Sequence, residues 1–70
     1  MHPLRAFRDQ RGLSQGQLAE LLEVARPSVT RWENGTRNVD ADKLPLISER
    51  TGIPPRALRP DLAALFEAAE

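Results

Sequence analysis

Residues 13–35 read LSQGQLAELLEVARPSVTRWENG, and this stretch decides the fold. Ser14 is followed three residues later by Gln17, the spacing of a capping box at the start of a helix. The capping box predicts a helix that begins at Gln15. This helix must end near Glu23, because a proline four residues further on cannot lie inside a continuing helix.

A second helix restarts within a few residues of the first. Pro27 suits its first turn, Val29 and Trp32 are spaced to face inward together, and Gly35 suits the residue just beyond its end. Two short helices joined by so tight a turn form a helix-turn-helix.

Glycine and proline divide the rest of the chain into segments of helical length. Nothing alternates with a period of two residues for long, so we predict an all-α fold. Further helices are expected from Pro3 to Gly12, from near Asp42 to Gly52 with Pro45 in the first turn, and from Pro55 through Leu58. Residues 61–70 form an amphipathic tail, in which Asp61 is the expected N-cap of a possible short sixth helix. The predicted organisation is a domain over residues 1–60 followed by this tail.

Composition excludes several classes of function. The chain has 70 residues, no cysteine and one histidine, so disulfides, cysteine-ligated zinc and an imidazole-based metal site are not expected. We expect no cofactor and no enzymatic activity, because nucleophile, base and phosphate-loop motifs are all missing. No apolar run approaches the ~20 residues of a membrane span, and no leader resembles a signal peptide. We therefore expect a cytoplasmic protein without membrane contact.

The distribution of charge is more informative than the net charge of zero. Residues 61–70 hold three acids and no base, so residues 1–60 carry ten bases against seven acids, or +3. Residues 24–39 hold three arginines and one acid. Nine of the ten bases are arginine, which suits planar contacts with phosphate and guanine. The pattern gives weak support for a nucleic-acid partner.

The stretch 13–35 also closely resembles the Cro/CI-type (Xre-like) helix-turn-helix family of phage and bacterial repressors, over about residues 3–59 of the chain. The matching positions are Leu13, Gln15, Leu18, Ala19, Val24, Val29, Arg31, Trp32, Glu33 and Gly35. The resemblance implies a compact five-helix repressor-type bundle that binds double-stranded DNA through the helix beginning near Arg26.

The resemblance assigns contacts residue by residue. The side chains facing the bases in the major groove would be Arg26, Pro27, Ser28, Thr30 and Arg31. The side chains approaching the backbone would be Gln15, Gln17, Asn34, Thr36, Arg37 and Asn38. Alternatives remain for three of them. Arg31 would serve equally well on a phosphate, Ser28 equally well as a helix cap, and Gln17 is better explained by its capping box.

Glu33 lies near the negative end of its helix dipole and needs a basic partner. Arg8 is the candidate, and the resemblance implies a partly buried salt bridge between the two; the alternative is two solvated side chains. His2 is expected to be a terminal bystander, and Trp32 to fill the core.

Three positions depart from the family pattern. Glu23 stands where the turn commonly has glycine, which suggests a differently shaped turn. Thr51 replaces a usual leucine, and Leu46 is apolar at an outward position. Together the last two suggest that something covers the outer face of the helix near Leu46.

The cover is either the tail folding back on its own chain or a second subunit. We favour a homodimer through Leu58, Leu62 and Phe66, because two reading heads match a palindromic operator. The predicted function is a sequence-specific transcriptional regulator, acting as a repressor. The alternative is an antitoxin or protein-interaction module whose acidic tail holds a protein partner.

Overall fold

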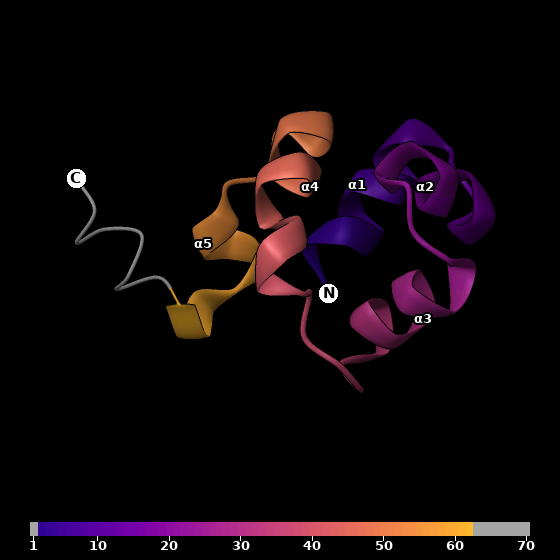
Figure 1. Ribbon diagram of the computed structural model, residues 1–70. Helices are drawn as coiled ribbons and strands as arrows, with labels where there is room; N and C mark the ends of the chain where they lie inside the picture. The colour runs from indigo at the N-terminus through magenta and orange to yellow at the C-terminus, as the bar shows by residue number, and fades with distance from the viewer. Residues whose placement is uncertain (1, 63–70) are drawn as a thin grey trace. The chain divides into compact units, whose positions relative to one another are not determined.

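The computed structural model describes residues 2–62, and every regular element among them is helical (Figure 1). The chain divides into two compact units at Asn38 and Val39. The first unit holds α1 (Pro3–Arg11), α2 (Gln15–Leu22) and α3 (Arg26–Asn34). The second holds the 3-10 turns η1 (Ala41–Lys43) and η2 (Pro60–Leu62), with α4 (Leu44–Thr51) and α5 (Pro55–Leu58) between them. The prediction of an all-α fold with five helices is confirmed.

The start of α1 depends on a residue that the sequence analysis dismissed. The Leu4 amide donates to Nδ1 of His2 over 3.1 Å, so the imidazole caps the helix. Pro3 follows in the first turn, where its missing N–H leaves no bond unmade. The expectation that His2 is a bystander is therefore wrong.

The predicted capping box at the start of α2 is present in full. The Gln17 amide donates to Oγ of Ser14 over 3.1 Å, and the Ser14 amide donates to Oε1 of Gln17 over 2.8 Å. Two amides that the helix itself leaves without partners are satisfied in this way. The start of α2 is thus set by contacts between residues close in sequence.

The three helices of the first unit end in the same manner, with a left-handed residue followed by a bond back to the last turn. The left-handed residues are Gly12 (φ 65°), Glu23 (φ 58°) and Gly35 (φ 76°). The amide after each one bonds back over 2.9 to 3.0 Å, from Leu13 to Arg8, from Val24 to Ala19 and from Thr36 to Arg31. Glu23 therefore adopts the conformation that favours glycine, and the suggestion of a reshaped turn is wrong at this residue.

α3 begins with the weakest cap of the three helices. Its N-cap is Ala25, which has no side-chain acceptor, and Pro27 lies in the first turn as predicted. The Ser28 amide bonds the Ala25 carbonyl over 3.0 Å. Within residues 2–62 the Ser28 hydroxyl makes no capping bond, so the capping alternative for this side chain is not supported.

Buried apolar side chains of the first unit come from all three helices. They are Leu4 and Phe7 of α1, Leu18, Ala19 and Leu22 of α2, and Val29 and Trp32 of α3. α2 packs directly on α3, and Ala19 of α2 is 3% exposed. Trp32 is 2% exposed, so it fills the interior as predicted and has no face left for stacking on a base.

In the second unit α4 starts later than predicted. The segment near Asp42 forms the 3-10 turn η1, and the α-helix begins only at Leu44. Pro45 has no N–H to donate to the carbonyl four residues earlier, so the α-helical pattern cannot extend back to Ala41. The Leu44 amide instead bonds the carbonyl of Ala41, three residues back.

Thr51 has a specific role at the end of α4. Its hydroxyl donates to the Ile47 carbonyl over 2.7 Å and accepts from the Ile53 amide over 3.1 Å. A leucine there would leave the Ile53 amide without this partner. Thr51 is buried and Leu46 half-buried.

The end of the described chain holds residues of the predicted dimer interface and of the predicted start of the tail. Leu58 of the predicted dimer interface is 4% exposed within the chain, and the interface itself stays a prediction. Asp61 lies inside η2, and its carboxylate accepts from Nε and Nη2 of Arg59 over 2.9 and 2.7 Å. The short sixth helix that it is expected to cap lies outside the described residues. Nη1 of Arg59 also bonds the Val39 carbonyl over 2.7 Å. Leu62 is half-buried, and Phe66 lies outside the described residues.

Replacing Ser14 tests the local origin of the α2 boundary. Ser14→Ala removes one acceptor from the first turn and should lower the free energy of unfolding by about 1 kcal/mol, measured by urea denaturation. Ser14→Asp keeps the acceptor and adds a charge that the helix dipole favours, so it should match or exceed the unsubstituted chain. Equal stability of all three proteins would contradict the role assigned to the cap.

Candidate nucleic-acid interface

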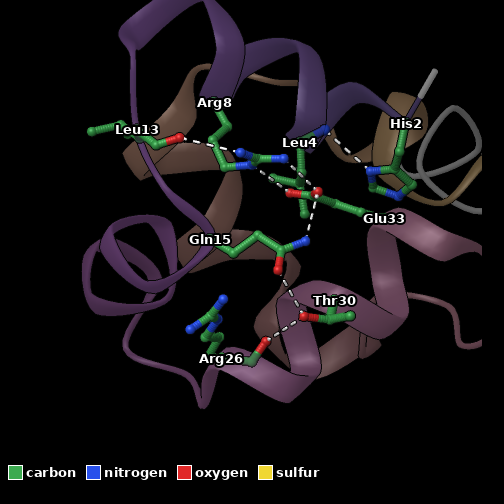
Figure 2. A network of polar contacts seen from close by, with 8 residues as sticks. All are labelled: His2, Leu4, Arg8, Leu13, Gln15, Arg26, Thr30 and Glu33. Carbon is green, nitrogen blue, oxygen red and sulfur yellow. Dashed lines mark hydrogen bonds and ion pairs between the residues drawn. The ribbon is translucent and has the colours of Figure 1, made fainter.

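An ion pair between α1 and α3 lies at the centre of the first unit's polar contacts (Figure 2). Nε and Nη2 of Arg8 donate to Oε2 and Oε1 of Glu33, each over 3.0 Å. Nη1 of Arg8 donates to the Leu13 carbonyl over 3.3 Å, which ties the loop before α2 to the same group. The Glu33 side chain is 4% exposed and that of Arg8 is 18% exposed. Arg8 and Glu33, the pair expected from the sequence, thus form a bidentate ion pair in which the carboxylate is buried.

A third side chain completes this arrangement. Nε2 of Gln15 donates to Oε1 of Glu33 over 3.2 Å. Burial acts to raise the pKa of Glu33, but the hydrogen bonds from Arg8 and Gln15, helped by the charges of Arg8 and Arg5, outweigh it and hold that pKa below its ordinary value. Glu33 is therefore ionised at neutral pH.

The contacts continue from Gln15 into the first turns of α3. The Thr30 hydroxyl lies 3.0 Å from Oε1 of Gln15 and 3.3 Å from the Arg26 carbonyl, and both are acceptors. Figure 2 shows the resulting row of side chains from Arg8 through Glu33 and Gln15 to Thr30. We call these four residues the polar relay. It connects α1 and α2 to the N-terminal half of α3.

The edge of α3 opposite the buried side chains of Val29 and Trp32 is open to solvent. Arg26, Pro27 and Arg31 are exposed, and Ser28 and Thr30 are half-buried. The one acid of residues 24–39 is Glu33, which is buried and neutralised by Arg8. The charged side chains that this stretch exposes are therefore all positive.

The residues expected on the DNA backbone lie in two groups. Asn34, Thr36, Arg37 and Asn38 are exposed, at the end of α3 and just after it. Gln15 and Gln17 lie at the start of α2, and both are engaged within the chain, Gln15 by the polar relay and Gln17 by the capping box. Among the described residues, one hydrogen of the Gln15 side-chain amide makes no bond, and neither does either hydrogen of the Gln17 side-chain amide, because Gln17 takes part in the capping box through its oxygen.

The relay is the part of the site that sequence reasoning missed. A buried carboxylate accepts more hydrogen bonds than one arginine donates to it, so a further donor was to be expected near Glu33. Gln15 is a polar residue that the fold brings close, yet the sequence offers no signal that selects it over Gln17. The capping role of His2 did have a signal, since the residue before a first-turn proline is the N-cap by position.

A family model described as "Helix-turn-helix" matches residues 4–58. The chain belongs to the helix-turn-helix family. The match confirms the resemblance to the Cro/CI type and places this helix-turn-helix protein among DNA-binding regulatory domains. No curated protein and no solved structure matches the chain.

Two further findings concern other kinds of site. Among residues 2–62, no set of three His, Cys, Asp or Glu side chains is grouped so as to hold a metal ion. None of the helices in that range is both long and apolar enough to cross a bilayer.

Replacing Arg8 tests how much the ion pair between Arg8 and Glu33 contributes to stability. Arg8→Met leaves the Glu33 carboxylate buried without its cation, and should lower the free energy of unfolding by about 3 to 5 kcal/mol in a denaturant titration. The double variant Arg8→Met, Glu33→Met removes both charges and should recover most of that loss. If the single variant loses less than about 1 kcal/mol, as is typical of an exposed pair, the carboxylate is not buried as described.

The cap on α1 predicts a pH dependence. Burial lowers the pKa of His2 from its ordinary 6.5, against a smaller opposing effect of the Glu33 charge. The unfolded chain thus takes up a proton that the folded chain resists, so stability should be full above about pH 6.5 and fall as the pH drops below it. Protonation also removes the Nδ1 acceptor.

His2→Asn supplies the control, because asparagine caps well and does not titrate. Its free energy of unfolding should change less between about pH 7.5 and pH 5.5 than that of the unsubstituted chain. Both proteins should lose stability at still lower pH as Glu33 is protonated. Parallel curves between the two pH values would contradict the assignment.

Proposed function

We propose that this chain is a sequence-specific regulator that binds double-stranded DNA by placing α3 in the major groove. The observation that carries the proposal is the exposed edge of α3, where Arg26 and Arg31 are open to solvent while Glu33 is withdrawn. Only the major groove is wide enough for a helix and shows a distinct donor and acceptor pattern for each base pair.

The spacing on α3 favours direct contact with bases. Arg26 and Thr30 lie one helical turn apart on one side of the exposed edge, and Pro27 and Arg31 lie one turn apart beside them. Arginine contacts O6 and N7 of guanine with two parallel bonds, so Arg26 and Arg31 are the proposed guanine readers. Pro27 offers no amide, and Ser28 adds a small hydroxyl next to them.

Positioning on the sugar-phosphate backbone falls to a separate set of residues. Arg37 supplies the charge, and its neighbours Asn34, Thr36 and Asn38 supply neutral donors. Gln15 is proposed to reach a phosphate with the second hydrogen of its side-chain amide, and Gln17 with a hydrogen of its own side-chain amide.

We further propose that the protein binds a palindromic operator as a homodimer and represses transcription by occluding a promoter. Two reading heads one DNA turn apart, about 34 Å, double the number of contacts. The proposed dimer contact is formed by Leu58, Leu62 and Phe66, and because Leu58 is 4% exposed within one chain, Leu62 and Phe66 would supply most of it. An acidic tail that holds a different protein is the competing outcome.

Selection of bound duplexes from a random pool, followed by salt titration, tests the proposal. The consensus should be palindromic, and the logarithm of the affinity should fall steeply with the logarithm of the salt concentration. Arg37→Ala should reduce that slope by about 1, and Arg31→Ala should relax the preference at one base pair by about tenfold. Arg56→Ala, an exposed arginine of α5, is the matched control and should change neither.

Several outcomes would count against parts of the proposal. Absence of duplex binding at low salt would contradict a DNA-binding function for the chain. A consensus without symmetry, together with a monomer in sedimentation at tens of micromolar with and without DNA, would contradict the homodimer.

A further inference from the structure

The directions of the hydrogen bonds in the polar relay are fixed from one end to the other. An arginine guanidinium only donates, and an ionised carboxylate only accepts. The side-chain amide of Gln15 must therefore turn its NH₂ group toward Glu33, as the 3.2 Å contact from Nε2 to Oε1 shows. Oε1 of Gln15 then faces the other way, toward Thr30.

This orientation determines what the Thr30 hydroxyl does. Its single hydrogen has two neighbours within reach, Oε1 of Gln15 at 3.0 Å and the Arg26 carbonyl at 3.3 Å. Both neighbours are acceptors that belong to the protein. Whichever of them the hydrogen meets, it is used inside the chain, and the oxygen retains only lone pairs for an outside partner.

Thr30 lies on the same side of α3 as Arg26, one turn later, and is half-buried. In the major groove the hydrogen-bond donors are the exocyclic amino groups of adenine and cytosine, whereas guanine and thymine present acceptors at the corresponding places. An oxygen that only accepts is attracted to the first pair of bases and repelled by the second.

We propose that Thr30 is a specificity-determining residue that accepts a hydrogen bond from the amino group of an adenine or a cytosine, and that Gln15 and Glu33 set this preference by consuming the hydroxyl hydrogen. The inference rests on the proposed function, since it names the chemistry that one position of α3 selects. Thr30 is thereby distinguished from Arg26 and Arg31, which only donate.

The test compares the unsubstituted chain with two variants at one position. Thr30→Val keeps the shape and removes the oxygen, and Thr30→Ser keeps the oxygen and removes the methyl group. In selections from a random pool, the unsubstituted chain and Thr30→Ser should both prefer adenine or cytosine at one position of each half-site. Thr30→Val should lose that preference while the rest of the consensus stays the same.

The amino group itself is then removed from the selected duplex. Replacing the adenine 6-amino or the cytosine 4-amino group by hydrogen at that position should weaken binding of the unsubstituted chain roughly 3- to 10-fold, the equivalent of one hydrogen bond. The same replacement should leave the affinity of Thr30→Val unchanged. The two analogues distinguish which of the two bases supplies the amino group.

The inference is overturned if Thr30→Val loses a preference for guanine or thymine, or if no position of the consensus responds to it. It is also overturned if Thr30→Ser behaves like Thr30→Val, because the methyl group would then be the reading element. Failure of the unsubstituted chain to bind any duplex would instead overturn the proposed function, so the two failures are distinguishable. Circular dichroism of each variant establishes that the helices are intact.

Discussion

The first unit depends on one buried negative charge. Glu33 has a side chain that is 4% exposed, and leaving such a carboxylate without partners inside a protein is strongly unfavourable. The fold supplies Arg8 from α1 and Gln15 from α2, so the position of α3 is tied to both of the other helices by charge-assisted bonds. The chain has few aromatic residues and no cysteine, so its apolar core is small. These directional contacts fix the position of α3 against α1 and α2 more closely than apolar packing alone would.

The same charge organises the outside of α3. With Glu33 withdrawn, the exposed charges of residues 24–39 are positive, which suits a polyanion even though the whole chain has a net charge of zero. The relay also passes the directionality of a carboxylate through Gln15 to Thr30 on the exposed edge. The need to satisfy the buried Glu33 carboxylate thus determines the direction of the hydrogen bonds at Thr30, on the exposed edge of α3.

Local signals predicted well what local chemistry controls. The capping box of Ser14 and Gln17, the first-turn prolines and the glycine ends gave the bounds of α1, α2 and α3, because each of these depends on residues close in sequence. The start of α4 was misplaced because the missing N–H of Pro45 acts on a carbonyl four residues back. Glu23 was misjudged because a left-handed conformation is disfavoured for glutamate but not forbidden, and the bond from Val24 to Ala19 closes the turn around it.

Contacts between residues far apart in the sequence were harder to predict. The hydrogen bonds of Gln15 to Glu33 and Thr30 could not be predicted from the sequence, because they depend on how the helices pack. The burial of Leu58 depends on packing in the same way.

Nuclear magnetic resonance of the labelled chain, titrated with its selected duplex, tests the central claim most directly. If α3 enters the groove, the largest changes in amide chemical shift will lie in residues 26–38, with further changes at Gln15 and Gln17 and small ones in residues 44–58. Changes confined to residues 39–62, with the amides of α3 unaltered at saturation, would contradict the account.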